Sequence, residues 1–358
     1  MMKATPETMA VAVESRLHRE EVELPSGQTM SYPPRIPLGL LPTRIAECPS
    51  LSARLGGRRL AIKHDDETGC VTTGNKVRKL EFYIAEAMQS GADTLVTAGS
   101  TLSNHCRTTA FVARELGYDV HLVLSGPESP LVNGNYLLML LAGAEIRLIP
   151  IERHDDKDDF VREAASELEA AGAIPYVIPP GGTGALGVIA YVRAVQELRD
   201  QLAETGTTVD AITVTFGSGS TYSGLLLGTR LLGLDLRVLG MSIGTEAGQC
   251  REIVRDLIAQ ACSVLGVDVP VSVDDILITD AYCGPGYGQN TESDFEFIKE
   301  MARETGLVLD PTYTGKAFRG TLEEMQTGQL ADCQDVLFLH TGGIFGLFPK
   351  RKRFGPSA

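Results

Sequence analysis

The chain has 358 residues and a formal net charge of -14, and hydrophobic and charged residues make up 43% and 22% of it. A chain of this length exceeds what one hydrophobic core usually serves, so we expect two domains. The acidic balance argues against a general nucleic-acid-binding surface and against binding to an anionic membrane.

Signals for targeting and for oxidised cysteines are weak. No apolar run reaches the ~18 residues that a membrane helix requires, and the N-terminus has no compact apolar segment after a basic start, so we expect no secretory signal. The seven cysteines are scattered and form no C-x-x-C pair, which predicts neither disulfides nor a zinc site. We therefore expect a cytoplasmic protein with reduced thiols, no resident metal and no membrane partner.

The first 35 residues mix charged and proline-rich segments, and we expect a loosely ordered arm that can end in a docked helix. Beyond it, short apolar runs alternate with helical patterns. Strands are predicted at 93–98, 119–124, 145–150, 175–178, 211–216, 237–242 and 335–340, and helices at 106–116, 136–142, 160–170, 188–202, 222–232, 295–305 and 317–327. This alternation predicts an α/β fold with mostly parallel sheets covered on both faces. Two such halves place the active site in the cleft between them, near the carboxyl ends of strands.

A lysine motif stands before the first of these strands, in residues 74–79, Gly-Asn-Lys-Val-Arg-Lys. A lysine amine can form a Schiff base with an aldehyde cofactor. Lys76 and Lys79 face one side of a helix start, and their spacing alone does not say which of them reacts. The alternative is a solvated basic first turn.

Polar and aromatic residues follow at other junctions. Ser103 precedes a helical run together with Asn104 and His105; an N-cap is the alternative for Ser103, and a hydrolase triad of sequence neighbours is a weak reading. Tyr287 and Tyr313 lie in loops, where aromatic residues often serve as packing plugs. Residues 341–343, Thr-Gly-Gly, follow the last strand and form a further candidate for close approach to a ligand.

A glycine- and hydroxyl-rich loop, residues 217–224, follows one strand and opens a helix. Free amides and the helix dipole at such a start favour a phosphate group. The loop is neither a Walker loop nor a G-x-G-x-x-G fingerprint, which disfavours a nucleotide-dependent dehydrogenase. The alternative is a tight turn capped by serine and threonine.

These motifs occur in one order that resembles a known family, the pyridoxal-phosphate enzymes that include 1-aminocyclopropane-1-carboxylate deaminase and D-cysteine desulfhydrase. The resemblance runs from about residue 36 to 348. It implies a fold type II, tryptophan-synthase-β-like architecture with two domains, and a homodimer that acts on a small amino acid. We expect residues 1–78 and 188–358 to form the large cofactor domain, with an N-terminal arm, and residues 79–187 to form the smaller α/β domain.

The resemblance also implies roles for single residues. Lys76 would carry pyridoxal 5'-phosphate as an aldimine, and Asn104 would contact the ring hydroxyl. The cofactor-binding set is Asn75, Lys76, Lys79, Asn104, Gly217, Ser218, Gly219, Ser220, Thr221, Thr314 and Thr341. The catalytic set is Lys76, Ser103, Tyr287 and Tyr313, and the substrate-binding set is Ser103, His105 and Tyr287.

The reaction follows from two positions. The deaminases carry a glutamate where Thr314 stands and a leucine where Thr341 stands, whereas the desulfhydrase-like branch carries hydroxyl residues at both. A hydroxyl leaves the pyridine nitrogen neutral and the electron sink shallower. We therefore expect α-proton abstraction and β-elimination to a 2-oxo acid and ammonia.

Several alternatives stay open at this stage. They are 1-aminocyclopropane-1-carboxylate deaminase, L-cysteate sulfo-lyase, a β-replacement synthase and a catalytically silent pyridoxal-phosphate-binding protein. The chain departs from the family around the substrate: residues 99–102 read Gly-Ser-Thr-Leu instead of Gly-Gly-Ile-Gln, His64 replaces a common arginine, and residues 344–348 are bulkier than usual. These departures put D-cysteine itself in doubt.

Overall fold

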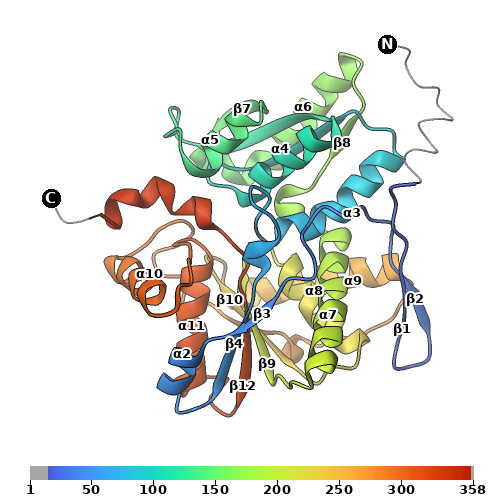
Figure 1. Ribbon diagram of the computed structural model, residues 1–358. Helices are drawn as coiled ribbons and strands as arrows, with labels where there is room; N and C mark the ends of the chain where they lie inside the picture. Colours follow the sequence, from blue (N-terminus) through green and yellow to red (C-terminus); the bar gives the residue numbers. More distant parts are fainter. Residues whose placement is uncertain (1–14, 356–358) are drawn as a thin grey trace.

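The protein is represented by a computed structural model that describes residues 15–355 (Figure 1). A six-stranded sheet forms its larger half, with the strand order β11-β10-β9-β12-β4-β3. All neighbouring pairs are parallel except β3 and β4, which are antiparallel. The strands are β3 (Ile45–Glu47), β4 (Arg59–Lys63), β9 (Ala211–Phe216), β10 (Arg237–Ser242), β11 (Leu277–Thr279) and β12 (Asp335–Leu339).

A second, four-stranded sheet forms the smaller half, which lies above the first in Figure 1. Its order is β7-β6-β5-β8 and all its pairs are parallel. The strands are β5 (Thr94–Ser100), β6 (Asp119–Gly126), β7 (Glu145–Pro150) and β8 (Pro175–Val177). One mostly parallel and one fully parallel sheet, both flanked by helices, therefore confirm the predicted α/β class.

Helices cover both faces of each sheet because the strands bury side chains on both sides. In β9, Ile212 packs against α7 and α8, whereas Ala211 belongs to the core beneath α10 and α11. In β5, Leu95 faces α3 and α4, and Val96 faces α6. The helices are α2 (Pro49–Arg54), α3 (Lys76–Gln89), α4 (Asn104–Leu116), α5 (Gly134–Leu141), α6 (Lys157–Ala170), α7 (Ala185–Thr205), α8 (Ser220–Leu231), α9 (Ala247–Leu265), α10 (Glu292–Thr305) and α11 (Thr314–Thr327).

The structure differs from the sequence prediction at several elements. Part of the expected N-terminal arm, residues 1–14, lies outside the described residues. The described part of the arm forms a hairpin of β1 (Glu21–Glu23) and β2 (Thr29–Ser31) instead of a docked helix. Helix α9 was not predicted, although its buried residues recur at helical spacing. Strands β3 and β11 have three residues each, too few for a readable alternation.

The strands of the small sheet all fall inside residues 79–187, and those of the large sheet fall outside that range. The expected boundary after residue 78 lies within α3. The division of the chain into domains at these residues stays a prediction. Between residues 15 and 355, no helix has the length and apolar character needed to cross a membrane.

Candidate active site

A cavity of 430 Å³ lies between the two sheets, at the carboxyl ends of their parallel strands. The end of β5, Thr215 of β9 and the turn that follows β12 all reach its wall. This is where side chains and helix starts converge in open parallel sheets. The cavity brings together these predicted residues: Asn75, Lys76, Lys79, Ser103, Asn104, His105, Gly217, Ser218, Gly219, Thr221, Tyr287, Tyr313 and Thr341.

Lys76 is the first residue of α3 and its amine lies on the cavity wall. Its Nζ donates a hydrogen bond to the carbonyl of Gly181 at 3.0 Å. Burial lowers the pKa of Lys76 to about 8. The neighbouring Asn75 donates from Nδ2 to Oγ1 of Thr221 at 3.1 Å, which ties the start of α3 to the start of α8. The lysine is thus fixed in place, and it loses its proton more readily than an exposed lysine does.

Lys79 and the loop before α8 form a place for an anion. Its Nζ donates to Oγ of Ser220 at 2.7 Å, at the first residue of α8. Gly219 takes a left-handed φ of 95°, and no side chain caps the helix, so the first amides of α8 keep free N–H groups. Burial, followed by the charge of Lys76, depresses the pKa of Lys79 well below its ordinary value. A phosphate here would meet free amides and restore the lysine charge.

His105 lines the same cavity as a neutral ring. Oγ1 of Thr97 donates to the carbonyl of Ile178 at 2.8 Å, so at 3.0 Å it accepts the proton on Nε2 of His105. Nδ1 of His105 then carries a lone pair and has no partner. Burial, together with the charges of Lys76 and Lys79, holds the histidine pKa well below its ordinary value.

Ser103 and Asn104 stand at the start of α4. Oγ of Ser103 accepts from the amide of Cys106 at 3.1 Å, so the predicted N-cap is present and the hydroxyl proton remains available. Oδ1 of Asn104 accepts from Nδ2 of Asn135 at 3.0 Å. The amide nitrogen of Asn104 is thereby turned outward as a donor, which suits a ligand oxygen.

Tyr287 and Tyr313 meet at the mouth of the cavity, with their hydroxyl oxygens 2.5 Å apart. Lys316 fixes the loop that carries Tyr287, because its Nζ donates to the carbonyls of Cys283 and Gly286 at 2.5 and 2.8 Å. Tyr287 is 47% exposed. One hydroxyl of the pair donates to the other, which leaves the second proton free for a third group.

Two predicted residues do not line the cavity. Ser220 stands behind Lys79 and contacts it. Thr314 is fully buried, and its Oγ1 donates to Oδ1 of Asp310 at 2.9 Å and accepts from the Asp310 amide. Burial raises the pKa of that Asp310 carboxyl to about 6. Thr341 does reach the wall, so of the two threonines it is the one whose side chain borders the cavity.

A buried ion cluster holds the start of α3 against the large half. Arg78 makes two-pronged contacts to Asp65 at 2.8 and 2.9 Å and to Glu197 of α7 at 2.8 and 2.9 Å. Lys63 adds a second cation to Glu197 at 2.5 Å. Arg78, Asp65 and Glu197 are at most 9% exposed. The cluster therefore fixes the first turn of α3, in which Lys76 lies two residues before Arg78 and lines the cavity.

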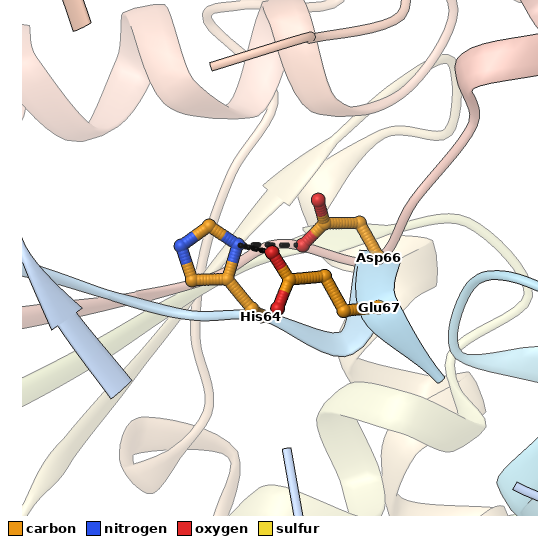
Figure 2. Close-up of side chains that lie close together, drawn as sticks. All are labelled: His64, Asp66 and Glu67. Atoms are coloured by element: carbon orange, nitrogen blue, oxygen red, sulfur yellow. Dashed lines mark hydrogen bonds and ion pairs between the residues drawn. The ribbon is translucent and has the colours of Figure 1, made fainter. Parts of the chain in front are cut away.

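Figure 2 shows a second cluster, His64, Asp66 and Glu67, which follows β4. Nδ1 of His64 lies 2.9 Å from Asp66 and 3.7 Å from Glu67. Burial would raise the pKa of Asp66, but the hydrogen bond from His64 and the charge of His340 lower it. Arg44 already binds both oxygens of Glu67, at 2.6 and 2.7 Å. The carboxylates of this cluster are thus already paired with Arg44 and His64, and we interpret the cluster as a structural network that stabilises the loop before residue 74.

The wall residues that the sequence analysis missed include Thr215, His154 and Lys157. Thr215 is buried at the end of β9, and its Oγ1 has no partner. Its position just before the glycine-rich loop was a usable signal. His154 and Lys157 lie in the turn between β7 and α6, and no motif marks them.

These groups fit an aldehyde cofactor that carries a phosphate. The fit rests on the unpaired Nδ1 of His105 and Oγ1 of Thr215, on the uncapped start of α8, and on a buried lysine pair. Within residues 15–355, neither Lys76 nor Lys79 has a carboxylate at ion-pair distance, so an anionic ligand would supply the missing partner.

Comparison with known proteins agrees with this fit. A family model described as pyridoxal-phosphate dependent enzyme matches residues 36–342, and the chain belongs to this family. A Pyrococcus abyssi protein with the provisional name 1-aminocyclopropane-1-carboxylate deaminase is 38% identical over 315 residues, 88% of this chain and 93% of that protein. The D-cysteine desulfhydrase of Salmonella choleraesuis is 38% identical over 320 residues, 88% of this chain and 95% of that protein. The crystal structure of an ACC deaminase homologue matches with a TM-score of 0.83 at 37% identity, over 90% of this chain and 96% of that chain.

The family settles the two broadest predictions from the sequence. The protein is an enzyme that depends on pyridoxal phosphate, and its fold is the type II fold expected from the motifs. The contribution of each wall residue to cofactor and substrate stays a prediction.

Proposed function

We propose that this enzyme removes a β-substituent from a small amino acid and releases a 2-oxo acid and ammonia. One observation carries the proposal. Among the described residues that line the cavity, the one carboxylate is Asp155, an exposed residue at the rim. Thr341 lines the wall instead, and a hydroxyl residue leaves a pyridine nitrogen neutral. A shallow electron sink suits substrates that lose an α-proton and carry a leaving group.

The wall residues divide the remaining work. The bound cofactor would withdraw electrons from the substrate α-carbon. With a pKa of about 8, the amine of Lys76 is partly neutral just above pH 7 and can accept the α-proton. The free proton of the Tyr287–Tyr313 pair can go to the departing group. Ser103 and the first amides of α4 can hold the substrate carboxylate.

The test is a substrate screen with the purified holoenzyme. β-Chloroalanine and cysteine, both enantiomers of each, are compared with 1-aminocyclopropane-1-carboxylate, and 2-oxo acid formation is followed with lactate dehydrogenase. We expect pyruvate from the β-substituted amino acids and little 2-oxobutyrate from the cyclopropane. Efficient ring opening with no elimination would contradict the proposal and favour the deaminase.

The assembly and location belong to the same proposal. We propose a cytoplasmic homodimer, and the dimer is supported by exposed leucines on α5, of which Leu141 is 72% exposed and Leu137 45% exposed. Apolar side chains gathered on one short helix favour burial against another surface. Light scattering of the eluted protein should give twice the chain mass, and Leu141→Asp should reduce it to one chain mass.

A further inference from the structure

The turn between β7 and α6 brings a positive charge to the cavity that the cofactor does not use. Lys157 is the first residue of α6 and lines the cavity from the small half. Its Nζ donates to the backbone carbonyl of His154 at 3.2 Å. Among residues 15–355, no carboxylate lies within ion-pair distance of this amine. The lysine is half-buried, and its charge has no anionic partner at the edge of the site.

The same turn is fastened to the substrate side of the cavity. Nδ1 of His154 lies 2.6 Å from Oγ of Ser125, at the end of β6. Ser125 Oγ donates in turn to the carbonyl of Gly99, beside Ser100 in the segment that departs from the family pattern. Lys157 is therefore held near the loop whose usual glutamine is missing here.

The charges of the cavity can be assigned one by one. Lys76 and Lys79 face the cofactor, and the two tyrosines are neutral. Burial, followed by the charge of Lys157, lowers the pKa of His154, so that ring is neutral at pH 7. Asp155 lines the rim but is exposed, so water screens its charge. Among the described cations that line the cavity, Lys157 is the one that the cofactor does not use and that the substrate can contact.

We propose that Lys157 selects substrates whose β-carbon carries an anionic oxyacid group, such as a sulfonate or a phosphate ester. This inference rests on the proposed β-elimination and names its substrate class. A neutral thiol would leave the ammonium group unmatched, whereas a sulfonate or phosphate would accept a charge-assisted hydrogen bond from it. The start of α6 does not add a second anion-binding group, because Asp158 and Asp159 stand in its first turn.

The chemistry balances for either group. With cysteate, the bond from the β-carbon to sulfur breaks and its electron pair leaves on sulfur as sulfite. The α-proton is lost, and one water is consumed as pyruvate and ammonium are released. With O-phosphoserine, the carbon–oxygen bond breaks and the electron pair leaves on inorganic phosphate.

Kinetics of the holoenzyme with matched substrates test the selection. Cysteate, O-phosphoserine and the uncharged-group analogue β-chloroalanine are supplied as both enantiomers, and 2-oxo acid is measured. Lys157→Gln should raise KM about tenfold for the anionic substrate that the wild type uses, which corresponds to ~1.4 kcal/mol, and should leave β-chloroalanine within about twofold. Arg153→Gln is the control, because Arg153 carries a charge in the same turn but does not line the cavity.

The outcomes separate this inference from the proposed function. If Lys157→Gln raises KM equally for charged and uncharged substrates, Lys157 binds the α-carboxylate and does not select the β-substituent. An unchanged KM for the anionic substrate would also overturn the selection. A binding readout does not need turnover: 3-sulfopropionate should raise the unfolding temperature of the holoenzyme and lose this effect in Lys157→Gln. If no β-substituted amino acid yields a 2-oxo acid, the proposed elimination is wrong. The change in unfolding temperature with 3-sulfopropionate still shows whether Lys157 binds the anion.

Discussion

Removing the guanidinium of Arg78 should cost more stability than removing any exposed cation of this protein. Arg78 binds Asp65 and Glu197 with two prongs each and is 2% exposed. In Arg78→Met, Asp65 keeps no cation within ion-pair distance among residues 15–355, and Glu197 keeps only Lys63. Breaking a buried pair in this way costs about 3–5 kcal/mol. We expect a loss of that size in the free energy of unfolding from urea titrations at pH 7.

A matched control separates burial from the chemistry of arginine. Arg44 also forms a bidentate ion pair, with the carboxylate of Glu67, but the two side chains are 54% and 44% exposed. Arg44→Met should cost no more than about 1 kcal/mol. Because α3 begins with Lys76, Arg78→Met should also lose cofactor on dialysis. A loss equal to that of Arg44→Met, with the cofactor retained, would refute the anchoring role of the cluster.

Further predictions concern the cofactor and the pH. Lys76→Ala should abolish labelling of the chain by borohydride reduction, and a pyridoxyl group found on another lysine of the wild type would contradict the assignment. Gly219→Asp places a charged side chain on a left-handed backbone position in the proposed phosphate-binding loop, so cofactor affinity should fall at least tenfold, or ~1.4 kcal/mol. If the variant retains the cofactor on dialysis as well as the wild type does, the loop does not bind the phosphate. Thr341→Val removes a single wall hydroxyl and should lower kcat/KM for elimination about tenfold, with unaltered kinetics counting against its role. Burial would raise the pKa of Glu197, but the hydrogen bond and charge of Arg78 lower it from 4.5 to about 2. The stabilisation that Glu197 contributes is therefore present above pH 4.5 and is lost as the pH falls toward 2. In Glu197→Gln, the free energy of unfolding from urea titrations should fall less between about pH 5 and pH 3 than it does in the wild type.

The sequence predicted the central elements well because their patterns are local. Strand β9 is a run of six buried residues, four of them apolar, and the structure has it at the predicted bounds, Ala211–Phe216. Helix starts were predicted two or three residues late, because polar first turns such as 104–105 and 220–221 carry no apolar signal. The cavity wall was predictable where a motif marked it, as at Lys76 and the loop after β9.

Most of the rest depended on contacts between distant residues. The exception is Thr314, whose hydroxyl binds Asp310 only four residues earlier, a local contact that the sequence analysis missed. The salt link from Arg78 to Glu197 spans 119 positions, and only the packing of α3 on α7 creates it. Lys157 lines the cavity at the start of α6, where the neighbouring His154 contacts Ser125 of β6, and single-residue patterns do not encode such a contact.

The buried anchoring of α3 has a consequence for how such an enzyme can change its substrate during evolution. The residues that would hold the cofactor are tied to the large sheet through Arg78 and through the contact of Asn75 with Thr221. Lys157 and His154 lie on a short turn of the small sheet, outside that network. Mutations in the turn can therefore accumulate without displacing Lys76, the lysine that we propose as catalytic. New specificities then become accessible by single substitutions in proteins that still fold and still bind the cofactor.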